Sequence, residues 1–131
     1  MFSYFTILSD TPYPGIDVQF ASVIDNSKRS EPVHALIDTG LSHTLVPQSI
    51  IRQLGIRVYE GDWEMLDASG NTTNVTRCTV LLKAEGWYEF QELKIYVVDN
   101  PDRTHVTIGR DIINKHSLRF DGTIKRWRYC E

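Results

Sequence analysis

The chain alternates apolar and polar residues along several short stretches, which is the pattern of half-buried β-strands. In the first stretch, Ile16, Val18 and Phe20 recur at every second position. The segment that follows it, DNSKRSE, has the composition of a turn and loop. The pattern predicts a mostly β chain with strands at residues 16–24, 33–37, 76–84 and 91–98.

One segment in the first half of the chain has helical spacing instead. In VPQSIIRQLGI, Pro47 fits the first turn of a helix and Gly55 fits its C-terminal stop. Ile50, Ile51 and Leu54 would then share one buried face. We therefore expect a short helix between these two residues.

The C-terminal part of the chain predicts one more helix and a hairpin. In GRDIINKHS the helix follows the glycine and should end near Lys115 or His116. Asp121-Gly122 lies between two strand-like runs, which is a strong hairpin signal. Many short strands with two short helices favour a closed or partly closed barrel. The length fits a single domain over residues 1–131.

The composition excludes several classes of protein. A formal net charge of −3 gives no indication of a nucleic-acid partner. No apolar run approaches the ~20 residues that a membrane helix needs. The N-terminal MFSYFTILSD lacks the basic start and the cleavage site of a signal peptide. Cys78 and Cys130 fit no metal-binding pattern and are expected to be free thiols, which favours a cytoplasmic location.

Candidate chemistry lies in three segments along the chain. Asp38-Thr39-Gly40 follows an apolar strand, MLDASGNTTNV (65–75) places small residues between strand-like arms, and VTIGRDII (106–113) leads from a strand into a helix. The Asp-Thr-Gly alone is a weak signal, because Asp and Gly are ordinary turn residues and tripeptides recur by chance. The three segments in this order are far more specific.

This order resembles that of the retropepsin-like aspartic proteases, the homodimeric class that includes the retroviral proteases. The resemblance extends from about residue 16 to about residue 128, and the IGRDII block matches the Gly-Arg-Asp/Asn motif of the family. It implies a retropepsin-like closed acid-protease barrel with a flap hairpin and two short helices. It also implies an aspartic endopeptidase.

The chemistry of such an enzyme needs two carboxylates. One acts as a base on water while the other supplies a proton to the peptide carbonyl and then to the leaving amine. Two carboxylates about 3 Å apart cannot both ionise, so the pair holds one proton. This chain has one Asp-Thr-Gly, so the second Asp38 would come from a second copy across a two-fold axis. We expect a homodimer that acts on an extended peptide, with no metal, no cofactor and no membrane or nucleic-acid partner.

The resemblance implies a role for each matching residue of the active-site loop. Asp38 matches the catalytic Asp, and Thr39 matches the residue whose hydroxyl reaches across the dimer. Gly40 matches the position where backbone approaches the substrate closely. Leu41 and Ser42, which come next, are expected to line the substrate cleft.

Two further blocks match the family pattern. The tip of the flap, whose backbone closes over a bound peptide, corresponds to Ala68, Ser69 and Gly70. The block that supports the catalytic loop corresponds to Gly109, Arg110 and Asp111. A substrate would lie extended between the flap and the floor of the cleft, held by main-chain hydrogen bonds.

The chain departs from the retroviral pattern just after the Asp-Thr-Gly. Leu41 stands where Ala is common, which affects the size of the pocket. Ser42 stands where Asp is frequent, so Arg110 needs another partner, either Asp111 or a carbonyl. The flap has one clear glycine, Gly70, at its tip, which predicts a stiffer flap.

Alternatives remain open from the sequence. One is a non-catalytic peptide-binding or assembly module on the same fold, which Leu41 favours. Another is an unrelated β-barrel with a fortuitous Asp-Thr-Gly. A Ser42-His43-Asp38 triad is disfavoured, because adjacent residues of a strand point to opposite faces.

The C-terminal TIKRWRYCE resembles the terminal strand of the family, which often joins an intermolecular sheet. Its Lys125, Arg126 and Arg128 fit a second interpretation, in which charges protect an exposed strand edge. The three tryptophans are interpreted as packing or interface residues: Trp63, Trp87 and Trp127.

Overall fold

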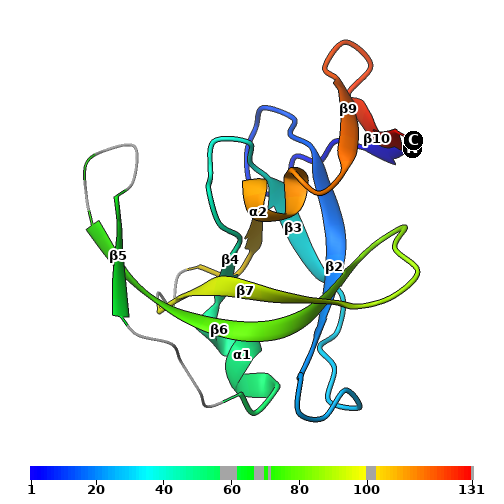
Figure 1. Ribbon diagram of the computed structural model, residues 1–131. Coiled ribbons are helices and arrows are strands. Elements are labelled where there is room, and N and C mark those ends of the chain that lie inside the picture. The colour runs from blue at the N-terminus through cyan, green and yellow to red at the C-terminus, as the bar shows by residue number, and fades with distance from the viewer. Residues whose placement is uncertain (57–61, 67–69, 71, 100–102, 131) are drawn as a thin grey trace.

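The protein is built mainly from β-strands, with two short helices (Figure 1). The computed structural model describes residues 1–56, 62–66, 70, 72–99 and 103–130. The strands are β1 (Phe2–Ser3), β2 (Gly15–Ala21), β3 (Val33–Ile37), β4 (Leu45–Pro47), β5 (Asp62–Leu66), β6 (Thr72–Ala84), β7 (Gln91–Val98), β8 (Val106–Ile108), β9 (Ser117–Asp121) and β10 (Arg126–Cys130). The helices are α1 (Gln48–Gln53) and α2 (Arg110–Ile113).

The larger sheet closes on itself. Its strands follow the order β2-β3-β8-β4-β7-β6-β5, and an additional pairing of β2 with β6 joins the two sides. Strands β2, β3, β8, β4, β7 and β6 therefore form a ring, from which β5 projects as the outer arm of a hairpin with β6. Pairing is antiparallel except between β3 and β8 and between β4 and β7. The predicted closed barrel is confirmed.

The core fills the inside of this ring, because alternate residues of each strand point inward. In β2 the side chains of Ile16, Val18 and Phe20 are buried and that of Asp17 is exposed. Ile51 and Leu54 of the α1 region add to the same core, as the helical spacing predicts. Gly55, at φ +68, follows the helix in the left-handed conformation that favours glycine.

Several predicted boundaries were wrong, for local reasons. The first barrel strand ends at Ala21 rather than at residue 24, because the Ser22 hydroxyl accepts the N–H groups of Ile24 and Asp25 and turns the chain. The second helix ends at Ile113, and the residues after it form a turn.

The C-terminal hairpin forms with a different turn from the one predicted. Asp121 is the last residue of β9 and pairs with Arg126, so residues 122–125 make up the loop. The Asp121 carboxylate accepts the Thr123 N–H, and the positive φ of 54° falls at Lys125 rather than at the glycine. The side chain of Asp121 and not a two-residue Asp-Gly turn starts the reversal.

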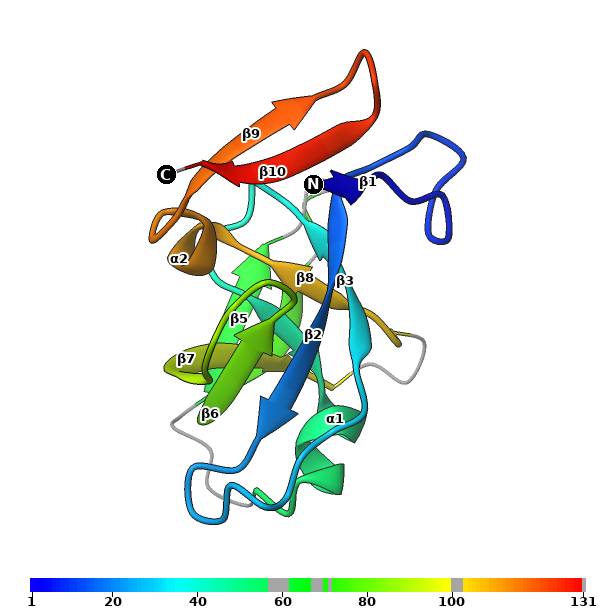
Figure 2. The same cartoon turned by 90° about the vertical axis from the view of Figure 1, so that its right-hand side faces the viewer.

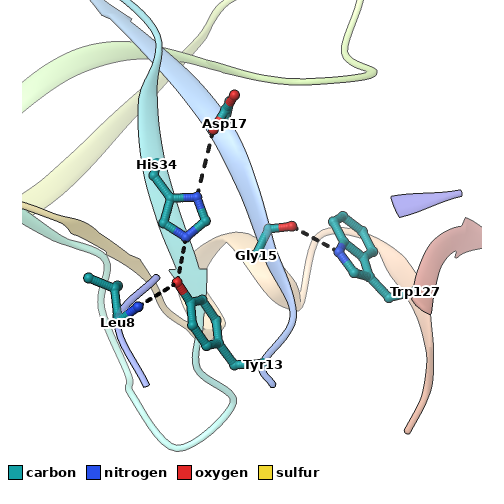
Figure 3. Close-up of polar contacts among 6 residues, drawn as sticks. All are labelled: Leu8, Tyr13, Gly15, Asp17, His34 and Trp127. Atoms are coloured by element: carbon teal, nitrogen blue, oxygen red, sulfur yellow. Dashed lines mark hydrogen bonds and ion pairs between the residues drawn. The ribbon is translucent and has the colours of Figure 1, made fainter. Parts of the chain in front are cut away.

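A second, smaller sheet in the order β1-β10-β9 covers one end of the barrel, opposite the end where α1 lies (Figure 2). Its central strand carries Trp127, which is buried and donates its indole N–H to the carbonyl of Gly15 at 3.0 Å (Figure 3). Trp127 and the partly buried Trp87 pack in or against the core, whereas the side chain of Trp63 lies outside the described residues. Within one chain β10 pairs with β1 along one edge and with β9 along the other.

His116 packs in the layer between this sheet and the barrel. Its ring stacks on Trp87 at a centroid distance of 5.0 Å, and its Nε2 is buried without a hydrogen-bond partner. Burial, together with the positive charge of Lys115, lowers the pKa of His116. The folded protein therefore binds a proton at His116 less tightly than the unfolded chain does.

We expect this histidine to make the protein less stable in mild acid. The stability it contributes is complete above the ordinary histidine pKa and is lost as pH falls below it. Substituting His116→Phe keeps a ring against Trp87 but removes the titration. The difference in melting temperature between about pH 7.5 and about pH 5 should therefore be smaller in the variant. An equal difference in both proteins would contradict this assignment.

Candidate active site

Asp38 directly follows β3, at the point where that strand leaves the barrel. Its backbone N–H donates to the carbonyl of Ile108 in β8 at 2.9 Å. Its carboxylate Oδ1 accepts the N–H of Gly40 at 2.8 Å, and the side chain is partly buried. A Cβ at Gly40 would lie 3.2 Å from that oxygen, so glycine allows the close turn around the carboxylate.

The start of α2 is docked onto the loop that carries Asp38. The N–H of Arg110 donates to the carbonyl of Leu41 at 2.7 Å, and the N–H of Asp111 donates to the carbonyl of Ser42 at 3.2 Å. The Arg110 guanidinium donates to the Thr39 carbonyl at 3.0 Å. Of the two partners expected for Arg110, the structure shows the carbonyl.

The carboxylate of Asp111 fixes the far end of the same loop. It accepts the N–H of Thr44 at 2.9 Å and the Thr44 hydroxyl at 2.8 Å. The same hydroxyl accepts the N–H of Gly109 at 3.1 Å. Thr44 is fully buried, so this network replaces water for every one of these groups.

Gly109 lets the two segments come this close. A Cβ there would lie 2.7 Å from the carbonyl carbon of His43 and 2.9 Å from the Leu41 carbonyl oxygen. Its φ is −100°, so the need for glycine comes from packing against backbone rather than from an unusual conformation. The Gly-Arg-Asp block thus touches the Asp-Thr-Gly loop through all three of its residues.

Thr44 offers a direct test of this network. Thr44→Val keeps the shape of the side chain but leaves the buried N–H of Gly109 without an acceptor. We expect a loss of about 1–3 kcal/mol in the free energy of unfolding, measured by urea denaturation. Thr104→Val, at an exposed threonine, is the matched control and should change stability by less than about 0.5 kcal/mol. Equal effects of both substitutions would contradict the proposed role of the network.

The residues after Gly40 form the edge of a small apolar cluster outside the main core. Leu41 and Tyr96 pack against Leu45, Val75 and Val98. The Leu41 side chain therefore has an apolar contact surface of its own, which accounts for a larger residue than Ala at this position.

One argument made from the sequence was wrong in its geometry. Ser42 and His43 lie in a loop rather than a strand, and Ser42 Oγ is 3.0 Å from His43 Nδ1. The His43 ring stacks on Tyr96 at a centroid distance of 4.5 Å. A triad is still not formed, because the described residues show no hydrogen bond between His43 and Asp38.

The hairpin expected to serve as a flap is present as the pairing of β5 with β6. Its last described pair is Leu66 with Thr72. Gly70 is exposed at φ +85, a conformation that favours glycine. Ala68 and Ser69 lie outside the described residues.

Sequence reasoning missed the residue that connects the two segments. Thr44 is a polar residue directly before an apolar pair, but its partner Asp111 lies 67 positions further along the chain. Nothing local indicates this pairing. No disulfide joins Cys78 and Cys130, which are both among the described residues.

The part of the chain that the structure describes contains no cluster suited to a metal ion, that is, no group of three or more His, Cys, Asp and Glu side chains arranged to hold one. None of the helices in this part of the chain has the length and apolar character that crossing a membrane requires.

Several solved structures have a fold similar to that of this chain. The EIAV protease complexed with the inhibitor HBY-793 is 18% identical, with a TM-score of 0.53 over 85% of this chain and 91% of that one. The retroviral protease-like domain of Ddi1 from Leishmania major is 13% identical, with a TM-score of 0.58 over 88% of this chain and 86% of that one. The foamy viral protease-reverse transcriptase, in complex with an RNA/DNA hybrid, is 15% identical, with a TM-score of 0.52 over 80% of this chain and 12% of that one.

At these identities the solved structures establish the fold alone. The sequence matches no curated protein. It does match the family model described as aspartyl protease, over residues 22–112, which contain both the Asp-Thr-Gly loop and the Gly-Arg-Asp block. An unrelated barrel with a fortuitous Asp-Thr-Gly is thereby excluded. The chain belongs to the aspartyl protease family and has the retropepsin-like fold.

Proposed function

We propose that this protein is an aspartic endopeptidase that is active as a homodimer, with one Asp38 carboxylate supplied by each copy. The observation that carries the proposal is the bracing of a single Asp-Thr-Gly loop by the Gly-Arg-Asp block. A loop held at both ends keeps its carboxylate in a fixed orientation, as general acid–base catalysis requires.

In the proposed mechanism the two Asp38 carboxylates share one proton and hold a water molecule between them. The ionised carboxylate takes a proton from the water as the oxygen attacks the peptide carbonyl. The protonated carboxylate gives its proton to the carbonyl oxygen, and the resulting tetrahedral intermediate breaks down as a proton passes to the leaving amine. The chemistry needs no metal, cofactor or covalent intermediate.

The surroundings of Asp38 support a site completed by a second copy. Thr39 is exposed, and its hydroxyl has no hydrogen-bond partner among the residues that the structure describes. In the proposed dimer this hydroxyl bonds to the loop of the partner copy, and the two loops meet at the two-fold axis. The protein does not then depend on a second Asp within its own chain.

We propose that the substrate is an extended peptide that lies between the Asp38 loop and the β5–β6 hairpin, which acts as the flap. The N–H and C=O groups near Gly70 would pair with the peptide main chain. Leu41 and Ser42 would line the floor. No observation favours the non-catalytic alternative, since Leu41 packs on its own apolar cluster.

The direct test is cleavage of a peptide library by the purified protein, with and without a statine-type inhibitor. A statine hydroxyl resembles the tetrahedral intermediate and should block the site. We expect cleavage that the inhibitor abolishes and that a metal chelator leaves unchanged. Cleavage unaffected by the inhibitor, or no cleavage by a protein shown to be folded and dimeric, would overturn the proposal.

A further inference from the structure

The face of the barrel next to Asp38 is defined by the alternation of β3. Ala35 and Ile37 point into the core, so His34 and Leu36 point to the opposite face. The next residue in that alternation is Asp38. Leu36 therefore lies on the same face about 7 Å from Asp38, which is the repeat of two strand residues.

Strand β8 continues this face. It runs parallel to β3 and places Thr107 opposite Leu36. Its flanking residues, Val106 and Ile108, belong to the core, so the Thr107 side chain shares the face of Leu36 and Asp38. On the other side, β4 places Leu45 opposite Thr107.

Arg103 covers Thr107, and none of the residues that the structure describes supplies a counter-charge for it. One of its terminal nitrogens donates to the Thr107 hydroxyl. Its Nε is buried and has no hydrogen-bond partner. The one ion pair among the described residues joins His34 and Asp17, so no described carboxylate pairs with this guanidinium. A half-buried charge in this state is costly unless a ligand supplies the anion.

Two histidines near Arg103, His105 and His34, do not neutralise its charge. Burial, together with the charges of Arg103 and His34, lowers the pKa of His105. His34 is itself satisfied, because its Nε2 is 2.8 Å from the Tyr13 hydroxyl and its Nδ1 is 3.7 Å from the Asp17 carboxylate (Figure 3). Arg103 is therefore the cation of this group whose charge remains to be matched.

The opposite side of the same face is apolar. Leu45 belongs to the cluster with Val75 and Val98 that Leu41 and Tyr96 border. The surface beside Asp38 thus changes from the partly buried Leu41 and Tyr96 on the β4 side to the guanidinium of Arg103, which precedes β8. A peptide lying across it would meet two chemically different surfaces.

We propose that Arg103 is a specificity-determining residue that binds the carboxylate of an acidic peptide side chain within a few residues of the scissile bond. This inference rests on the proposed function. The guanidinium of Arg103 suits a carboxylate, since both groups are planar and can form two parallel hydrogen bonds. The protein would therefore favour substrates with Asp or Glu at one fixed position.

Binding of the acid can be tested without catalysis. The probes are N-acetyl-glutamate amide and N-acetyl-glutamine amide, titrated into the ¹⁵N-labelled wild-type protein. We expect saturable shifts of the Thr107 and His105 backbone amides with the glutamate probe alone. Arg103→Gln should abolish these shifts, Arg103→Lys should retain them in part, and Arg119→Gln, at an exposed arginine on β9, should leave them unchanged. Equal shifts with both probes, or none, would overturn the inference.

A cleavage experiment separates this inference from the proposed function. Products of a proteome-derived peptide library should show Asp or Glu enriched about tenfold at one position near the cut, and Arg103→Gln should remove the enrichment. Cleavage without acidic enrichment would overturn the role of Arg103 and leave the protease intact. Glutamate-specific shifts in a folded, dimeric protein that cleaves nothing would overturn the proposed protease function and leave the binding of an acidic side chain by Arg103 standing.

Discussion

Replacing Asp38 with Asn is expected to lower kcat/KM by a factor on the order of 10⁴ or more, with the fold unchanged. Asparagine is nearly the same size and can still accept the N–H of Gly40 through its carbonyl oxygen. It cannot take a proton from water, so neither copy of the variant supplies a base. Peptide cleavage measured beside the melting temperature of the same sample separates lost chemistry from lost structure.

The matched control is Asp17→Asn, which removes a carboxylate from an exposed position on β2. It should leave kcat near the wild-type value. Wild-type rates in Asp38→Asn would show that catalysis does not use this carboxylate.

Replacing Gly109 with Ala is expected to destabilise the fold strongly. The added Cβ would lie 2.7 Å from the His43 carbonyl carbon and 2.9 Å from the carbonyl oxygens of His43 and Leu41. All of these are backbone atoms, so no flexible side chain can move away to relieve the contact. We expect a loss of about 3 kcal/mol in the free energy of unfolding, measured by urea denaturation.

Activity should fall further than stability accounts for, because the displaced backbone belongs to the loop that carries Asp38. Gly122→Ala is the matched control, since a Cβ there meets nothing within 4 Å and its φ is not positive. It should change stability by less than about 0.5 kcal/mol. Similar destabilisation by both substitutions would mean that packing at Gly109 is not the cause.

The sequence predicted strands best where one face is buried without interruption. Leu93, Ile95 and Val97 alternate cleanly, and β7 has the predicted bounds. It predicted too long a strand at residues 16–24, because Val23 and Ile24 continue the apolar run but are exposed. Here the hydroxyl of Ser22 decides where the strand ends, and hydrophobicity gives no signal of it.

Short elements were missed for a related reason. Strand β4 has three residues, too few to show a period, and its last residue, Pro47, also precedes α1. The sequence placed Pro47 in the first helical turn, whereas it lies just before the helix and ends the strand. Pairing with β7 and β8, both distant in sequence, holds β4 in place.

The candidate site was predictable to the extent that it consists of motifs. Asp38 and the Gly-Arg-Asp block could be found from residue types and their order. Thr44 and Arg103 could not, because their importance depends on partners brought together by the fold. In the sequence Thr44 and Arg103 look like any other threonine and arginine. Only the structure shows that Thr44 is buried and that no described carboxylate pairs with Arg103.

The central claim, that one active site needs an Asp38 from each of two chains, can be tested by titrating Asp38→Asn protein into the wild type with full exchange of subunits. If both carboxylates are required, activity at constant total protein should fall as the square of the wild-type fraction, so that an equal mixture retains about one quarter of it. A linear fall, with about one half retained, would show that each chain acts independently, and about three quarters retained would show that one Asp38 per dimer suffices; either result would contradict the two-chain site.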